Sequence, residues 1–266
     1  MTVRSPLPVS VILPCHDAAG TIERAIGTVA AQTRPPAEVI AVDDASTDAT
    51  AELLSRIARQ AWPFRFEVIA LPDNRGAAGA RNAGWARADE SAAYIAFLDA
   101  DDLWLPRKLE RQIAWMEQRP EVAWTAHRCR VMGESPCSSW DGAVRSTKPL
   151  TTRGLLARNS VATPTVVVRR GVPGRFRVGW RHCEDLMLWL DWLDEGARGE
   201  MLDIPLAELG RMPTSPGGST GDLAAMYRGE QRVISTLLAE GRLPGLEASA
   251  WRGYAWLRYL RRRMRS

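Results

Sequence analysis

The sequence has no long hydrophobic run and no strong excess of charge of one sign. Its longest apolar stretches, Val9 to Cys15 and Ala92 to Leu98, are far shorter than the roughly 18 residues that a membrane-crossing helix needs, which excludes a spanning protein. Lysine and arginine number 35 against 31 aspartates and glutamates, which gives a net charge of +4. So small an excess does not by itself indicate a nucleic-acid partner.

Closely spaced cysteines and a secretion signal are also missing. The four cysteines are scattered without a C-x-x-C pair, which favours reduced thiols over a disulfide framework. Three prolines, Pro6, Pro8 and Pro14, interrupt the apolar start, and no small-residue cleavage site follows them. We therefore expect a cytoplasmic protein whose first residues already belong to the fold.

The chain of 266 residues, 45% of them hydrophobic, is long enough for one large domain or for one domain with an appended piece. Its first hundred residues alternate β-branched runs with apolar residues at helical spacing. This pattern predicts strands at 9–13, 38–42, 66–71 and 94–98, and helices at 22–29, 47–60 and 77–88. Strands separated by helices predict an α/β fold with a mostly parallel sheet covered on both faces.

The second part of the chain has a weaker pattern. It predicts helices at 106–118, 153–158 and 185–195, and strands at 122–126 and 165–168. A loop rich in glycine and proline at 211–221 precedes two closing helices, one at 222–240 and one from about residue 247 onward.

Acidic residues follow two of the predicted strands directly. The second strand leads into Asp43-Asp44, and the fourth into Asp99-Ala100-Asp101-Asp102. Because ligands of such sheets bind beyond the carboxyl ends of the strands, both clusters lie at the expected binding edge. If the backbone stays extended, Asp99 and Asp101 face one ligand together and offer the oxygen donors that Mg²⁺ or Mn²⁺ takes beside phosphate. The alternative is that these aspartates cap the helix that begins near Pro106.

A glycine-rich segment, Asp73-Asn74-Arg75-Gly76-Ala77-Ala78-Gly79-Ala80-Arg81-Asn82, follows the third predicted strand. Its glycines let the backbone approach a ligand, and its two arginines suit phosphate or a base. Because it lacks both the P-loop Gly-Lys-Ser/Thr and the G-x-G-x-x-G pattern, it indicates neither an ATPase nor a dinucleotide enzyme. The alternative is an ordinary turn into a helix.

These motifs, taken in order, resemble those of the family 2 glycosyltransferases, which have the GT-A fold. The segments that carry the resemblance are Val9-Ser-Val-Ile-Leu-Pro-Cys-His-Asp, Val42-Asp-Asp-Ala-Ser-Thr-Asp, Asn74-Arg-Gly with Ala80-Arg-Asn, Phe97-Leu-Asp-Ala-Asp-Asp and Cys183-Glu-Asp. The resemblance implies inverting transfer of a sugar from a nucleoside diphosphate sugar, with uridine as the expected base, to a hydroxyl of a glycan or lipid-linked acceptor. The expected setting is the synthesis of bacterial cell-surface polysaccharide or glycolipid.

The resemblance also implies a role for each matching residue. The residues that it implies for nucleotide-sugar binding are Pro14, Cys15, His16, Asp43, Asp44, Arg75, Gly76, Arg81, Asp99 and Ala100. Asp101, together with Asp99, would ligate Mn²⁺ or Mg²⁺, and Asp185 would be the catalytic base with Glu184 as its substitute. Family members commonly carry Asn where this chain has Asp17.

Sugar transfer needs a stabilised leaving diphosphate, a base for the acceptor hydroxyl and exclusion of water. The metal would serve the first need, and Asp185 the second as the hydroxyl attacks the anomeric carbon opposite the diphosphate. Capping of a helix is the alternative use of Glu184-Asp185. The loop at 211–221, through Arg211, Ser215 and Ser219, would meet the diphosphate and exclude water, unless it is an ordinary linker.

We expect residues 1–210 to form the GT-A domain, with a nucleotide-sugar half at 1–105 and an acceptor half at 106–210. Residues 211–266 would form a loop and a basic helical extension, in which aromatic residues alternate with six arginines from Trp251 to Ser266. Such a helix suits the anionic inner face of a membrane, while nucleic-acid binding and a plain solvated helix are the alternatives.

Two rival functions fit the same fold. A sugar nucleotidyltransferase would carry a glycine-rich loop with Arg and Lys after the first strand, and residues 14–20 contain neither basic residue. A noncatalytic nucleotide- or glycan-binding scaffold at the membrane surface is the second rival. The presence of Asp99, Asp101 and Asp185 argues against it, and no nucleic-acid partner is expected.

Overall fold

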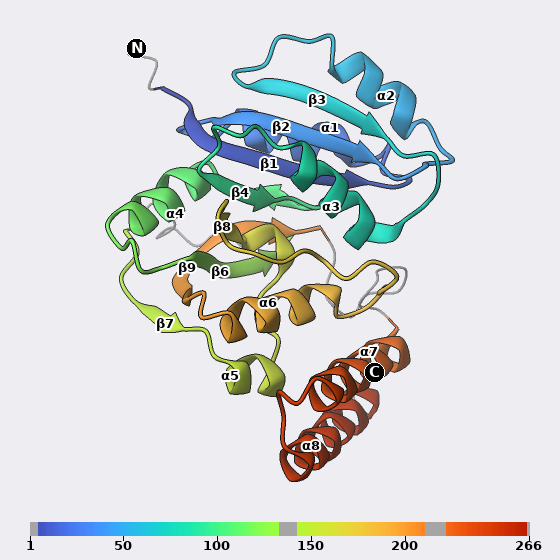
Figure 1. Ribbon diagram of the computed structural model, residues 1–266. Coiled ribbons are helices and arrows are strands. Elements are labelled where there is room, and N and C mark those ends of the chain that lie inside the picture. The colour runs from blue at the N-terminus through green and yellow to red at the C-terminus, as the bar shows by residue number, and fades with distance from the viewer. Residues whose placement is uncertain (1–4, 133–142, 211–221, 265–266) are drawn as a thin grey trace.

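A computed structural model describes residues 5–132, 143–210 and 222–264 (Figure 1). Its first half alternates strands and helices: β1 (Leu7–Cys15), α1 (Ile22–Ala30), β2 (Pro36–Asp43), α2 (Thr50–Ile57), β3 (Arg65–Ala70), α3 (Gly76–Arg87) and β4 (Tyr94–Phe97). Strands β3, β2, β1 and β4 lie side by side in that order and run parallel. The four strands and three helices that the sequence predicts here are confirmed.

The second half adds five strands of very different length and the remaining described helices. It contains β5 (Leu103–Trp104), α4 (Lys108–Glu117), β6 (Trp124–Val131), β7 (Thr147–Pro149), α5 (Thr152–Ala157), a 3₁₀ turn η1 (Thr163–Thr165), β8 (Val167–Arg169), α6 (Glu184–Asp194), β9 (Gly199–Leu209), α7 (Leu223–Ala239) and α8 (Gly245–Arg263). The sheet order is β3-β2-β1-β4-β8-β6-β9-β5, with β7 paired to β9. Strands β8, β5 and β7 run against the others, so the sheet is mostly parallel as predicted.

Alternation along β1 sends side chains to two cores, one on each face of the sheet. Val11 and Leu13 pack with the apolar faces of α1, α2 and α4, whereas Ile12 packs with α3 and α6 on the other face. Helix α3 lies so close to the sheet that a Cβ at Gly84 would be 2.6 Å from Cγ2 of Ile12. The glycine therefore sets how closely α3, which carries Arg81, packs on the sheet.

Helices α7 and α8 pack against each other and, through α8, against α5 (Figure 1). They lie at the end of the molecule beyond the second half of the sheet. Among the described residues, no helix combines the length and the apolarity needed to cross a bilayer.

Candidate active site

The carboxyl ends of β1 and β2 bring the first two predicted motifs together. Cys15 is in register with Asp43, and the N–H of Asp44 donates to the carbonyl of Cys15 at 2.8 Å. Asp43 is buried and accepts hydrogen bonds from the backbone and the hydroxyl of Ser46. The segment from Pro14 to His16 therefore lies beside Asp43 and Asp44, at the edge where the sequence predicts the nucleotide.

Asp44 and His16 join this edge to the glycine-rich segment. The Asp44 carboxylate accepts the N–H of Arg75 at 2.7 Å, and the ring of His16 lies 3.0 Å from the Asp44 carbonyl and 3.2 Å from the Asn74 amide. Gly76, which begins α3, has φ +71°, a conformation that side chains disfavour. Three segments far apart in the sequence thus form one continuous loop surface.

Asp17, which replaces the usual asparagine, has φ +48° and accepts the N–H of Thr47 at 2.7 Å. Asparagine and aspartate are the residues that tolerate this left-handed conformation best after glycine. The replacement therefore keeps the local backbone shape.

Arg81 forms ion pairs with two carboxylates that are far apart in the sequence. Its side chain is only 6% exposed, and it donates to Asp99 at 2.7 Å and to Glu184 at 3.3 Å. Burial alone would lower the pKa of Arg81, but these two carboxylates raise it. The guanidinium therefore stays charged, and it holds the end of β4 next to the start of α6, a contact that the sequence analysis missed.

The aspartates after β4 do not continue the strand, so the condition of an extended backbone, under which Asp99 and Asp101 were expected to face one ligand, is not met. The N–H of Asp102 donates to the carbonyl of Asp99 at 3.0 Å, which closes a tight turn through Ala100 and Asp101. Asp99 and Asp101 still line one cavity. The turn brings them together where an extended strand was expected to do so.

Asp102 stabilises this turn from behind. Its carboxylate accepts the N–H of Gly210 at 2.8 Å, and a Cβ at Gly210 would lie 2.0 Å from the carbonyl oxygen of Asp101. Burial, and then the charge of Asp99, raise the pKa of Asp102 to about 8. Since the end of β9 packs this closely, only glycine fits there.

The alternative that these aspartates cap the next helix is also wrong. Helix α4 begins at Lys108 without a side-chain cap at its N-cap residue, and the N–H of Leu109 donates to the side-chain oxygen Oε1 of Gln32 at 3.1 Å. The side chains of Asp99, Asp101 and Asp102 therefore belong to the cavity wall and its turn and do not cap α4.

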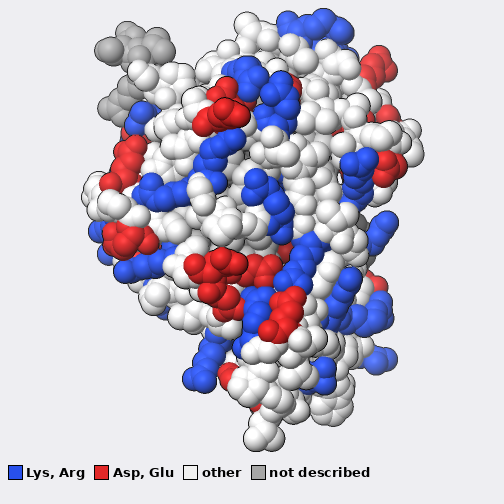
Figure 2. Space-filling view, viewed as in Figure 1, with Lys and Arg blue, Asp and Glu red and all other residues white. Residues whose placement is uncertain are grey.

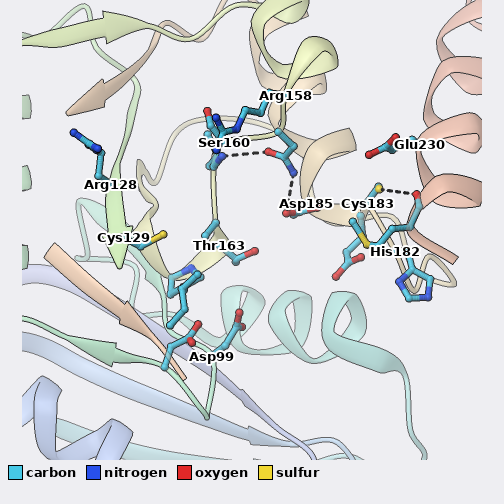
Figure 3. A pocket seen from close by; sticks show the side chains of 18 of the residues that line it. Asp99, Arg128, Cys129, Arg158, Ser160, Thr163, His182, Cys183, Asp185 and Glu230 are labelled. Atoms are coloured by element: carbon cyan, nitrogen blue, oxygen red, sulfur yellow. Dashed lines mark hydrogen bonds between the residues drawn. The ribbon is translucent and has the colours of Figure 1, made fainter. Parts of the chain in front are cut away.

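Asp185 lies in the first turn of α6 and faces the cavity. One carboxylate oxygen accepts the N–H of Leu186 at 2.7 Å, and the other is 3.4 Å from the amide nitrogen of Asn159 (Figure 3). Burial, followed by the charge of Glu184, raises the pKa of Asp185 to about 6. Asp185 does cap one helix N–H, that of Leu186, as the alternative predicted. With a pKa of about 6, its carboxyl is still mostly ionised at neutral pH.

Packing of α6 fixes the direction of these two acids. Trp189 and Trp192 on the inner face of α6 are fully buried, with ring centroids 4.8 Å apart. The ring of Trp124 stacks on that of Trp189, with 5.5 Å between the centroids. At the start of the helix, Cys183 has φ +60° and turns the chain into its first residue. Because Glu184 pairs with Arg81, Asp185 is the acid free to meet a substrate.

A single cavity of about 960 Å³ connects these groups, and its walls include Arg81, Asp99, Asp101, Glu184 and Asp185. The other predicted donor residues are not part of its walls; they are Pro14, Cys15, His16, Asp43, Asp44, Arg75, Gly76 and Ala100. They form the adjoining edge of the sheet. Arg211 and the predicted loop at 211–221 lie outside the described residues.

The walls also contain residues that the sequence analysis did not predict for the site. Asn159 lies in a loop without any recognisable motif, so only the fold could reveal its contact with Asp185. Arg258 and Arg262 belong to the basic tail, for which the sequence predicted a membrane surface. Their spacing of four residues, which places both on one helix face, was the available signal.

Comparison with known proteins shows the family of the chain. The family model described as "Glycosyl transferase family 2" matches residues 10–168, more than half of the chain. The chain belongs to this family. The family 2 assignment rests on the strands and motifs of the first half, and the match extends as far as β8.

Two individual proteins are similar to this chain over most of their length. The chain is 34% identical over 210 residues to the putative teichuronic acid biosynthesis glycosyltransferase TuaG of Bacillus subtilis, covering 78% of this chain and 80% of TuaG. It is 32% identical to WfgD of Escherichia coli, a UDP-Glc:alpha-D-GlcNAc-diphosphoundecaprenol beta-1,3-glucosyltransferase, covering 70% of each.

The mannosyltransferase PcManGT of Pyrobaculum calidifontis, solved with GDP-Man and Mn²⁺, matches with a TM-score of 0.66 at 19% identity. This match covers 95% of this chain and 75% of the other. The predicted GT-A fold is confirmed.

Proposed function

We propose that this family 2 glycosyltransferase moves a sugar from a UDP-linked donor to a hydroxyl of a lipid-linked or glycan acceptor, with inversion at the anomeric carbon. The observation that supports this most is the shared cavity, in which Asp185 and the Asp99–Asp102 turn lie on either side of Arg81. The donor nucleotide would lie along Pro14–His16, Asp43 and the glycine-rich segment. UDP is the nucleotide in the name of WfgD.

A divalent ion fits the aspartate turn. Within the described ranges no three acidic, histidine or cysteine side chains are arranged as a complete metal site. Mn²⁺ and Mg²⁺ need fewer, because they are commonly held by one or two carboxylates and complete their shell with phosphate oxygens and water. Asp101 and Asp99 would hold the ion, which would neutralise charge on the departing diphosphate.

Asp185 would take the proton of the attacking hydroxyl. With a pKa of about 6 it is mostly ionised at neutral pH, yet it is a stronger base than an ordinary aspartate. Asn159 holds one of its oxygens, and the N–H of Leu186 holds the other, so the carboxylate is oriented before the acceptor arrives. The hydroxyl would attack from the side opposite the diphosphate, so that one displacement inverts the configuration.

We also propose that the enzyme works at the inner face of the cell membrane. Leu246, Leu257 and Met264 follow one face of α8 at spacings of 11 and 7 residues and are 90%, 52% and 78% exposed. Exposed Trp256 flanks this stripe, and the helix ends in Arg261, Arg262 and Arg263. Apolar residues beside cations suit an anionic lipid surface, where the lipid-linked acceptor would be found.

The test is a panel of nucleoside diphosphate sugars. We expect one UDP-sugar to be hydrolysed slowly in the presence of Mn²⁺ and to protect the protein from thermal unfolding, because a bound ligand stabilises the folded state. A panel without hydrolysis or protection would instead favour the noncatalytic scaffold.

A further inference from the structure

The cavity wall beyond Asp185 is positively charged. Away from the aspartate turn and Arg81, its basic residues are Arg128, Lys148, Arg158, Arg181, Arg258 and Arg262. Only two carboxylates join them there, and both are already paired: Asp203 with Arg128 at 3.0 Å, and Glu230 with Arg258 at 2.7 Å. The remaining cations carry an uncompensated charge.

Three of these cations have no partner of their own. Within the described ranges, the side chains of Arg158, Arg181 and Arg262 form no ion pair, hydrogen bond or ring contact, and all three are exposed at the cavity. Other half-buried arginines form ion pairs: Arg177 and Arg242 each pair with the carboxylates of both Asp191 and Glu240. Unpaired guanidinium groups that converge on one cavity indicate an anionic ligand.

The position of these arginines points to the acceptor and away from the donor. Arg158 directly precedes Asn159, whose amide contacts Asp185 at 3.4 Å. Arg262 lies one helical turn beyond Arg258, and Arg258 donates to the carbonyl of Ala157 at the end of α5. In Figure 3, Asp99 lies at one end of the view and Arg158 at the other, with Asp185 between them.

We propose that Arg158, Arg181 and Arg262 bind a phosphate or diphosphate group that is attached to the acceptor. The inference rests on the proposed function, because it takes Asp185 as the group that meets the acceptor hydroxyl. A sugar with its hydroxyl at Asp185 would carry the anion on its far side, where guanidinium groups can hold phosphate oxygens in pairs. No bond is made or broken in this step, which fixes only the orientation of the acceptor.

The two faces of α8 give this site a connection to the membrane. Arg258 and Arg262 face the cavity, while Leu246, Leu257 and Met264 lie exposed on the helix. A helix that lies on lipid by its apolar stripe would thus present Arg262 to a phosphate held near the lipid headgroups. This arrangement favours a prenyl diphosphate over a soluble sugar phosphate.

The experiment is a calorimetric titration of the full chain with geranyl diphosphate, after UDP and Mn²⁺ have saturated the donor site. We expect geranyl diphosphate to bind, and Arg158→Ala and Arg262→Ala each to weaken that binding about tenfold, which corresponds to one lost charged contact of about 1.4 kcal/mol. Arg24→Ala is the matched control, because Arg24 is equally exposed but lies on α1, on the opposite face of the sheet. UDP affinity should be unchanged in all three variants.

Further titrations identify the source of the anion. Geraniol, which lacks the phosphates, should not bind. Inorganic pyrophosphate that binds as tightly as geranyl diphosphate, with the same loss in Arg262→Ala, would support the site and assign it to a soluble phosphate. Binding that is equal in the wild type, Arg158→Ala and Arg262→Ala would overturn the site, as would tighter binding of an oligosaccharide that carries carboxylates and no phosphate.

The two proposals fail in different ways. If UDP with Mn²⁺ does not bind at all, the proposed function is wrong. If UDP binds while geranyl diphosphate does not, only the acceptor-phosphate site is wrong.

Discussion

Arg81 is the residue on which the geometry of the site depends most. It is buried, and it pairs with two carboxylates: Asp99 just after β4 and Glu184 at the start of α6. Removing it would leave Asp99 and Glu184 close together without a counter-charge. Breaking such a buried pair typically costs 3–5 kcal/mol, whereas an exposed pair contributes little.

We expect Arg81→Met to lose about 3 kcal/mol of folding stability and more than a hundredfold in kcat/KM for sugar transfer. Chemical denaturation and initial rates measure the two effects. Arg81→Lys should recover little, because one ammonium cannot bridge two carboxylates as the guanidinium fork does. Arg87→Ala, which removes an exposed pair with Glu67, is the control and should change neither value appreciably.

If Asp185 is the base as proposed, the activity has a defined pH dependence. Because burial and Glu184 raise its pKa to about 6, the base becomes protonated as the pH falls through 6. We expect kcat/KM to be constant above about pH 7 and to fall tenfold per pH unit well below pH 6. A profile that stays flat down to pH 4.5 would assign the base to another group.

The same raised pKa also affects stability. A carboxyl whose folded pKa lies above its unfolded value destabilises the protein when it is ionised, so the cost is present above pH 6 and disappears as the pH falls towards 4. Asp185→Asn should therefore raise the melting temperature at pH 8 and have little effect at pH 4. Equal changes in melting temperature at pH 4 and pH 8 would show that burial does not raise the pKa of Asp185.

At the scale of elements, the close packing of α3 on β1 sets the position of Arg81. Gly84 has no room for a side chain, whereas nothing lies within 4 Å of a Cβ added at Gly27 in α1. These two helical glycines form a matched pair, because the intrinsic helical gain from glycine to alanine is the same for both.

We expect Gly84→Ala to destabilise the protein by about 1–3 kcal/mol through overpacking, and Gly27→Ala to stabilise it by about 0.5–1 kcal/mol. Urea unfolding of both variants measures the difference. Ile12→Ala, which removes the contacted Cγ2, should cost less stability in the Gly84→Ala background than in the wild type. If Gly84→Ala is neutral on its own, α3 does not pack on the sheet as described.

At the scale of the whole molecule, positive and negative charges are mixed on the surface, whereas the large exposed apolar side chains are concentrated in one region. Lys and Arg are interspersed with Asp and Glu across the face in Figure 2, while large exposed apolar side chains gather on α8. Interspersed charges do not form the continuous basic stripe that nucleic acid requires on this face. The apolar side chains exposed on α8 support the proposal that this helix contacts a membrane.

We expect the protein to sediment with vesicles that contain about one third anionic lipid and not with neutral vesicles, and binding to weaken at high salt. The double variant Leu257→Ser/Met264→Ser should lose most of this binding while keeping its affinity for UDP. As a control, Val178→Ser removes an apolar side chain that is 63% exposed outside α8 and should bind as the wild type. Undiminished sedimentation of the double variant would exclude α8 as the membrane contact.

The sequence was sufficient for the first half of the fold because its signals are local. β-Branched runs mark β1 to β4, and apolar residues at helical spacing mark α1 to α3. The sequence analysis missed β9, because Pro205 and several charged residues interrupt its apolar pattern. The pairing of β9 with β6 also contains register shifts. Local patterns cannot show such a strand, because it is defined by its partner.

For the site, sequence reasoning placed the acids but not their contacts. Asp99, Asp101 and Asp185 were predicted from motifs, whereas the Arg81–Glu184 pair joins residues 103 positions apart in the sequence. The turn at Asp99–Asp102 was missed because it is closed by a backbone hydrogen bond and by Gly210, neither of which leaves a pattern near the motif.

The most direct test compares Asp185→Asn with the wild type in two assays on the same preparation: affinity for UDP with Mn²⁺, and the rate of sugar transfer. We predict unchanged UDP affinity and a fall in transfer of at least a thousandfold, because the variant keeps the shape of the cavity but has no carboxylate to accept the proton. Transfer within tenfold of the wild type, with UDP still bound, would contradict the assignment of Asp185 as the base.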